Sequence, residues 1–98
     1  MTMYQVEQTE VFEDWLDSLR DPMAKFKIAK RLVRIRSGLL GDWKSLGDGV
    51  SELRIPYGPG YRLYYTMRGQ FVVLLLCGSD KKGQAKAIAK AKEMAKQI

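Results

Sequence analysis

The sequence contains no histidine and a single cysteine, Cys77. Histidine is the commonest general acid–base residue and the commonest ligand of transition metals, so other side chains would have to fill both roles. With one thiol besides, the chain lacks the ligand set of a zinc site, and we expect no metal or other cofactor. One cysteine also excludes a disulfide within the chain, and its place in an apolar run predicts a buried thiol.

Long apolar runs are also missing. The longest covers residues 71–77, far short of the roughly 20 residues that cross a bilayer, so we expect no membrane partner. The first ten residues have neither the basic nor the apolar region of a secretion signal, which predicts a cytoplasmic protein. At 98 residues, we expect a single domain over residues 1–98 with one modest core.

Acidic residues are the minority among the charged side chains. There are 17 Lys and Arg against 11 Asp and Glu, which gives a formal net charge of +6. This excess on a small surface favours a polyanionic partner, which could be nucleic acid, an acidic protein or the ribosome. Composition alone does not choose among the three.

An amphipathic helix is predicted near the N-terminus. Thr9 is a suitable N-cap, and apolar residues follow at the spacing i, i+3, i+4, i+7, namely Phe12, Trp15, Leu16 and Leu19. Trp15 fits either a platform on which a base stacks or an anchor of the core. Its place on the apolar stripe favours the core.

A second helix is predicted to begin at Asp21 and Pro22 and to stop at Gly38. Its buried stripe consists of Ala24, Ile28, Leu32 and Ile35. Its other faces carry six cations, Lys25, Lys27, Lys30, Arg31, Arg34 and Arg36. These cations fit either a solvated face that attracts polyanions at long range or a specific contact with RNA or an acidic partner. The two helices together predict a helical hairpin that covers another element.

Five strands are predicted from apolar–polar alternation and from turn signals. They cover residues 3–7, 43–46, 50–55, 61–68 and 71–77, and a Lys- and Ala-rich helix follows over residues 83–98. The order β-α-α-β-β-β-β-α indicates an α+β domain. Its sheet is expected to be antiparallel and covered by helices on one side.

Two arginines are predicted to face each other on this sheet. If the hairpin closes so that Ile55 faces Tyr61, Arg54 lies directly opposite Arg62. Like charges in this position are unfavourable, whereas two guanidiniums would suit a phosphate. The alternative is that one arginine pairs with Glu52 and the other is solvated.

Three motifs carry a resemblance to a known family. They are Glu52-Leu53-Arg54, the run GPGYR at residues 58–62, and the run LLCGSDK at residues 75–81. In this order and spacing the chain resembles the RelE/ParE superfamily of bacterial toxins, and within it the HigB-like addiction module killer branch. The likeness covers nearly the whole chain.

The resemblance implies a RelE-like fold, which is also described as microbial-RNase-like, and a toxin of a type II toxin–antitoxin system. Many such toxins are endoribonucleases, or mRNA interferases, that cut mRNA on the ribosome without a metal and inhibit translation, and we expect this activity here. A cognate helix-turn-helix antitoxin of the HigA type neutralises it. We expect the free toxin to be a monomer and its complex with the antitoxin to be a hetero-oligomer.

The resemblance also implies a set of site residues. By position, Arg62 matches the strand arginine that stabilises the phosphate, and Arg54 falls where that branch has a lysine on the preceding strand. Lys81 or Lys82 falls near a basic residue after the last strand. The candidates for proton transfer are Tyr64, Asp80 and Lys81. Further cations are expected to bind RNA phosphates, namely Lys82, Arg68 and Lys44.

This chain departs from the family pattern in two places. It has neither the catalytic histidines of some HigB members nor the late tyrosine of RelE, which leaves the proton-transfer residue open. The same departures keep an alternative function open, a non-enzymatic toxin of the ParE type that binds DNA gyrase, because a shared fold does not fix function.

Overall fold

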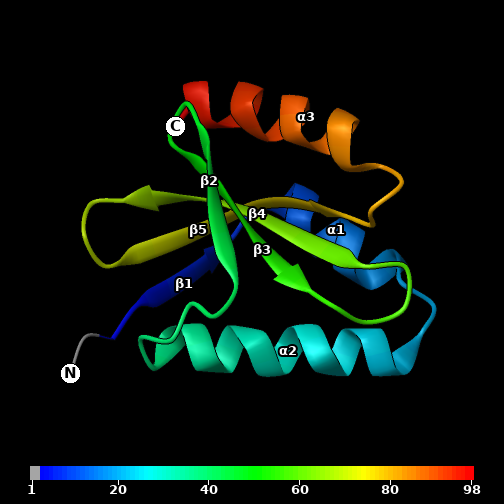
Figure 1. The fold of residues 1–98 in the computed structure, drawn as a ribbon. Helices are drawn as coiled ribbons and strands as arrows, with labels where there is room; N and C mark the ends of the chain where they lie inside the picture. Colours follow the sequence, from blue (N-terminus) through cyan, green and yellow to red (C-terminus); the bar gives the residue numbers. More distant parts are fainter. Residues whose placement is uncertain (1–2) are drawn as a thin grey trace.

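The structure, a computed structural model, describes residues 3–98 and contains one five-stranded sheet with three helices (Figure 1). The elements are β1 (Gln5–Gln8), α1 (Glu10–Ser18), α2 (Pro22–Arg36), β2 (Trp43–Gly47), β3 (Val50–Ile55), β4 (Tyr61–Arg68), β5 (Val72–Ser79) and α3 (Gln84–Lys96). This order agrees with the one predicted from the sequence. Within residues 3–98, no helix is both long and apolar enough to span a membrane.

The sheet has the strand order β1-β5-β4-β3-β2. The strands β2 to β5 form the expected antiparallel meander, but β1 pairs with β5 in parallel, with Gln5 opposite Val72. The prediction of a purely antiparallel sheet is therefore wrong at this edge. Local alternation predicts a strand but not its partner, which is why the sequence did not reveal the parallel pairing.

The helices begin where the capping residues predicted. The Thr9 side chain accepts a hydrogen bond from the Phe12 amide (3.0 Å), and Asp21 accepts one from the Met23 amide (2.9 Å). Gly38 follows α2 with φ at +93°, a conformation that glycine adopts without strain. The predicted helical hairpin fits in part: α1 and α2 follow each other and share one core, with α1 against β5 and α2 beside β1.

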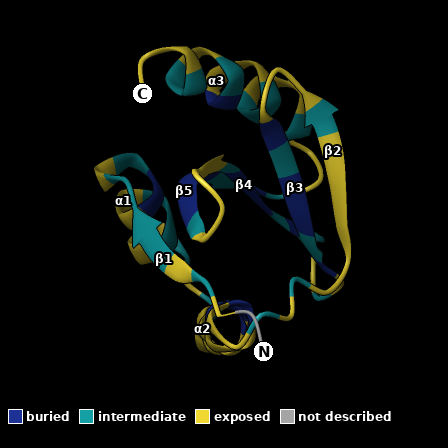
Figure 2. Ribbon diagram, turned by 90° about the vertical axis from the view of Figure 1, so that its left-hand side faces the viewer, coloured by how far each residue is buried: buried dark blue, intermediate teal, exposed yellow. Residues whose placement is uncertain are grey.

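Both faces of the sheet are covered, which corrects the expectation of helices on one side. Figure 2 shows α3 across one face, with α1 and α2 on the other side of the sheet. The core under α1 and α2 includes the four predicted stripe residues of α2 and Phe12. The core under α3 is smaller and contains Tyr64, Leu74, Leu76, Cys77 and Ala91.

Trp15 belongs to the core, as its position on the apolar stripe favoured. Its ring centroid lies 5.7 Å from that of Phe12 and 6.3 Å from that of Tyr61. Gly78 of β5 lies directly under the indole, and a Cβ at this glycine would overlap the ring. Trp15 therefore anchors α1 on β5, with its ring half-buried against the core.

The prediction of a buried Cys77 thiol is confirmed. A bulge in β5 places Tyr64 opposite Cys77 and Tyr65 opposite Leu75, so that Leu76 and Cys77 both pack towards α3. Burial raises the pKa of the Cys77 thiol to about 11. The bulge also lies next to the point where β4 and β5 carry the candidate site.

Candidate functional site

The site lies where β3 ends and β4 begins. Arg54 and Arg62 are direct cross-strand partners, as predicted, and Ile55 faces Tyr61. The loop between them closes through a hydrogen bond from the Gly60 amide to the Tyr57 carbonyl (3.0 Å). Because paired residues of neighbouring strands point to the same face, the two guanidiniums share the side of the sheet on which α3 lies.

A buried carboxylate lies between the two arginines. Glu52 Oε1 is 3.3 Å from Arg54 Nε, and Glu52 Oε2 is 3.7 Å from Arg62 Nε. The Glu52 side chain is 1% exposed, against 14% for Arg62 and 41% for Arg54. Glu52 therefore contacts both arginines, whereas the simple alternative had one paired and the other solvated. It compensates the repulsion that the arginine pair would otherwise create.

Two buried atoms of the cluster formed by Glu52, Arg54 and Arg62 lack a hydrogen-bond partner among the described residues. Glu52 Oε2 and Arg62 Nε are buried and find no hydrogen-bond partner among residues 3–98. They face each other as an ion pair at 3.7 Å, slightly beyond hydrogen-bond length. The cluster is thus held by charge more than by hydrogen bonds on the Arg62 side.

Lys81 lies beside Arg62, as the sequence suggested. A Cβ at Gly60 would lie 3.7 Å from both Arg62 Nη1 and Lys81 Cβ, so the three residues are neighbours. The Lys81 amide donates to the Pro59 carbonyl (3.4 Å), which ties the segment after β5 to the loop before β4. Lys82 follows and is exposed.

Tyr64 forms the floor under the cluster. It is fully buried opposite Glu52, and its hydroxyl lies 3.0 Å from Ser79 Oγ. Burial, more than any neighbouring charge, raises the pKa of this hydroxyl. A buried phenol with a raised pKa is neutral at physiological pH and out of reach of a substrate, which argues against Tyr64 as the proton carrier.

Asp80 has a local structural task. Its Oδ1 accepts a hydrogen bond from the Gly83 amide (2.8 Å) and so shapes the turn that leads into α3. Among the described residues, no hydrogen bond or ion pair joins Asp80 to the two arginines. Of the three proton-transfer candidates, only Lys81 is an exposed residue next to Arg62, because Tyr64 is buried beneath the cluster.

The two remaining candidates differ in position. Lys44 of β2 lies directly opposite Glu52 and is exposed, so it belongs to the same patch. Arg68 does not belong to it. It lies six residues from Arg62 along β4, roughly 20 Å away at the rise of a strand, and pairs with Glu7 at 2.9 Å. Alternation placed Arg68 on the correct face, and the six-residue spacing from Arg62 was a usable signal that it lies far from the site.

Sequence reasoning missed three residues near the site. Glu52 was considered only as a partner for one arginine, although its place two residues before Arg54 on the same face was a usable signal. Ser79 faces Arg62 across the sheet and has no such signal. Arg31 was grouped with the solvated cations, yet it is buried and donates to the carbonyls of Leu40, Asp42 and Arg54 (2.8–3.0 Å).

Comparison with known proteins gives a relative. A protein of Haemophilus influenzae described as uncharacterized is 44% identical over 94 residues, which cover 96% of this chain and 95% of that protein. The chain belongs to the same family as this Haemophilus protein. No protein-family model matches the chain.

A solved structure identifies the fold of the family. The free state of a double arginine mutant of Escherichia coli toxin RelE superposes with a TM-score of 0.75, at 18% sequence identity, over 95% of this chain and 98% of that one. The family member described here therefore has a RelE-like fold, as the three motifs implied. At this level of identity the likeness establishes the fold alone.

Proposed function

We propose that this chain is a toxin of a toxin–antitoxin system, of the HigB-like branch, that inhibits translation by cleaving mRNA on the ribosome. The RelE-like fold and the net charge of +6 support this assignment. The observation that carries it is the pair of Arg54 and Arg62, which face each other around buried Glu52 with Lys81 alongside.

The arrangement suits the transition state of RNA cleavage by the 2′-hydroxyl. In this reaction the 2′-oxygen bonds to the adjacent phosphorus while the bond from phosphorus to the 5′-oxygen breaks, leaving a cyclic phosphate and a free 5′-hydroxyl. Negative charge grows on the other phosphoryl oxygens. Glu52 engages the Nε side of both arginines, and Arg62 Nη1 donates to the Gly60 carbonyl (3.3 Å). The terminal nitrogens of Arg54 and Nη2 of Arg62 remain to donate to those oxygens.

Glu52 acts in this proposal as a positioning residue. Its buried carboxylate does not reach an external substrate, but it sets the direction of both guanidiniums and lowers the net charge of the trio to +1. Preorganised donors need no rearrangement during the reaction, which is the main source of electrostatic catalysis.

Lys81 is the residue to which we assign proton delivery. Its ammonium group donates a proton to the departing 5′-oxygen, and the 2′-hydroxyl proton leaves to solvent. An amine is a weak acid at neutral pH, so we expect this step to contribute less than the arginine pair does.

The test is induction of the protein in bacterial cells followed by primer-extension mapping of translated transcripts. Wild type is expected to arrest growth and to cut these transcripts. Arg62→Ala removes one charge-assisted donor, which should cost about 3 kcal/mol of transition-state stabilisation, or roughly a hundredfold in rate. Arg36→Ala, an exposed arginine at the end of α2, is the matched control and should cut like wild type.

Two outcomes would contradict the proposal. Full cleavage by Arg62→Ala would remove this arginine from the mechanism. Growth arrest without cut transcripts, together with inhibition of purified DNA gyrase in a supercoiling assay, would instead favour the ParE-type alternative.

The proposal includes a partner. A helix-turn-helix antitoxin of the HigA type is expected to bind the free toxin and to form a hetero-oligomer with it. Co-expression with the product of the neighbouring gene, followed by size-exclusion chromatography, tests this. If the two proteins elute separately and growth arrest persists, this gene product is not the antitoxin.

A further inference from the structure

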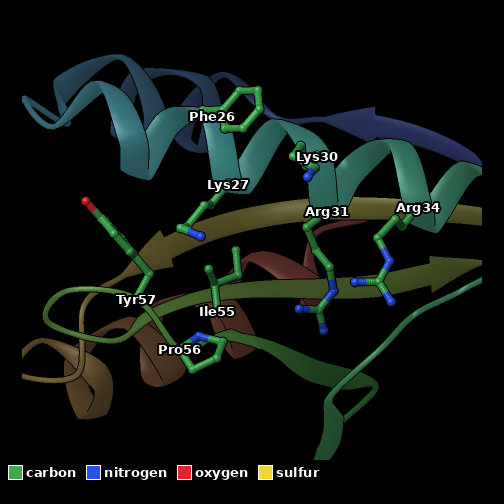
Figure 3. Close-up of a pocket in the computed structure, with 8 residues that line it drawn as sticks. All are labelled: Phe26, Lys27, Lys30, Arg31, Arg34, Ile55, Pro56 and Tyr57. Carbon is green, nitrogen blue, oxygen red and sulfur yellow. The ribbon is translucent and has the colours of Figure 1, made fainter.

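A second basic surface lies on the other side of β3. The helix α2 and the residues after β3 enclose a groove of about 280 Å³. Figure 3 shows Lys27, Arg31 and Arg34 reaching from α2 towards the end of β3 at Ile55 and the Pro56 that follows it. We call this surface the α2 groove.

Among the described residues, no carboxylate forms an ion pair with a cation of the α2 groove, although the charge of Asp42 acts on Arg31 from nearby. Arg31 is 9% exposed, and its three hydrogen bonds all go to backbone carbonyls. Burial lowers the pKa of the Arg31 guanidinium, and the neighbouring charge of Arg34 adds to this effect. No acidic side chain lines the groove, and Lys27, Lys30 and Arg34 form no ion pair with any of residues 3–98. An external anion would supply the missing charge.

An aromatic ring lies at one end of the groove. Lys27 Nζ is 5.3 Å from the centroid of the Tyr57 ring, and the Tyr57 hydroxyl donates to Asp21 Oδ2 at 2.7 Å, which fixes the ring. Phe26 stands at the rim, 56% exposed, with Lys30 Nζ 5.5 Å from its ring. Cations interleaved with accessible aromatic rings are typical of surfaces that bind single-stranded nucleic acid.

The α2 groove and the pair of Arg54 and Arg62 lie on opposite faces of the same end of β3. Arg31 Nη1 donates to the carbonyl of Arg54 at 2.8 Å, while the Arg54 side chain points to the opposite face towards Glu52. Ile55 and Pro56, which line the groove, follow directly in the chain. A polyanion that crosses the end of β3 at Pro56 can therefore contact both basic surfaces.

We propose that the α2 groove binds the ribose–phosphate backbone of single-stranded RNA that continues from the phosphate held by Arg54 and Arg62. This inference rests on the proposed function, since it takes the strand in the groove to be a flanking part of the same substrate. Lys27, Lys30 and Arg34 contact phosphates, and the exposed ring of Phe26 at the rim offers a surface on which a base stacks.

Equilibrium binding tests the groove without cleavage. The probe is a fluorescein-labelled 2′-O-methyl RNA of about twelve nucleotides, which lacks the attacking hydroxyl, followed by fluorescence anisotropy at several salt concentrations. The variant Lys27→Gln/Lys30→Gln/Arg34→Gln changes three exposed residues. It should weaken binding about tenfold or more, and loss of three phosphate contacts should flatten the salt dependence by about 2 in logarithmic slope.

The matched control lies on α3. Lys86→Gln/Lys90→Gln/Lys96→Gln removes the same charge from exposed positions across the sheet and should change affinity less than threefold. A probe of about three nucleotides reaches only the arginine pair, so the groove variant should bind it like wild type. Arg62→Ala should weaken binding of both probes.

Three results would overturn the inference. The groove variant could bind the long probe as tightly as wild type, or the groove and α3 variants could lose equal affinity for it. The groove variant could also lose binding to a polyglutamate peptide while its RNA binding stays intact. The last would make the groove a protein interface. Cleavage of transcripts is measured separately from RNA binding. If Arg62→Ala still cleaved transcripts while the groove variant bound RNA weakly, the proposed nuclease mechanism would be rejected and RNA binding by the groove would stand.

Discussion

Two pairs of arginines lie on opposite sides of β3, and the protein holds them in different ways. Arg54 and Arg62 share the carboxylate of Glu52, which aims both guanidiniums and leaves the trio with a net charge of +1. Arg31 donates hydrogen bonds to three backbone carbonyls. Arg34 lies beside it and forms no ion pair with any of the described residues.

The difference separates two kinds of anion recognition. A carboxylate fixes the direction of a cation but cancels charge, which suits one phosphate held in one geometry. Carbonyl dipoles fix Arg31 and leave its full charge in place, which suits a backbone that is held along its length. Four substitutions, from the largest expected effect to the smallest, can break or sharpen this contrast.

Arg31→Ala should have the largest effect on stability. It leaves three carbonyls without their donor, and the lost charge-assisted bonds should lower the free energy of unfolding by about 4 kcal/mol. Urea denaturation measures this. Arg34→Ala is the control and should change stability by less than about 0.5 kcal/mol, because its side chain is exposed. Equal losses of unfolding free energy in the two variants would show that the hydrogen bonds from Arg31 to the three carbonyls do not stabilise the fold.

Glu52→Ala should destabilise the other pair. It leaves two guanidiniums facing each other, one of them mostly buried, which should cost about 3 kcal/mol of unfolding free energy. The double variant Glu52→Ala/Arg62→Met removes the repulsion and should recover part of the loss in the same urea experiment. A further loss in the double variant would mean that Glu52 does not act through the charge of Arg62.

Tyr64→Phe should have a smaller effect, of about 1 kcal/mol at neutral pH, because the hydrogen bond to Ser79 is lost. The substitution should also change how the free energy of unfolding depends on pH in the alkaline range. The pKa of Tyr64 is raised in the folded state, so its contribution is present below the unfolded pKa of roughly 10 and is lost as pH rises through the folded pKa. Tyr57 and Tyr65 have pKa values raised in the same direction.

Urea titrations at increasing pH, with tyrosinate absorbance as a second signal, should therefore show that stability falls less steeply in the Tyr64→Phe variant. Ser79→Ala removes a hydrogen bond that lowers the pKa of Tyr64 but keeps the buried phenol, so stability should fall with pH at least as steeply as in wild type. If the unfolding free energy fell equally steeply with pH in Tyr64→Phe and in wild type, the Tyr64 phenol would not be enclosed beneath Glu52.

Arg68→Ala should have the smallest effect. Its ion pair with Glu7 is exposed and should contribute about 0.5 kcal/mol or less. Because Arg68 lies at the far end of β4, the variant should also cleave transcripts within about twofold of wild type, in contrast to Arg62→Ala. A loss as large as that of Arg62→Ala would show that the substrate extends along the whole strand.

The sequence predicted the parts of the structure that depend on local rules. The caps at Thr9 and Asp21, the stripe of α2 and the pairing of Arg54 with Arg62 follow from spacing and turn chemistry. The role of Arg31 could not be predicted, because backbone carbonyls carry no residue-specific signal. The position of Arg68 was missed because a strand face extends much farther than a binding site.

The parallel pairing of β1 with β5 has a consequence for synthesis of the chain. Thr9 Oγ1 donates to the carbonyl of Leu76, which lies 67 residues later, and β1 has the same distance to its partner strand. At typical translation rates the first strand waits roughly 3 to 13 seconds for β5 to be made. The β1 edge of the sheet therefore closes only after β5 has been synthesised, and a chain that stops before β5 cannot acquire its complete sheet.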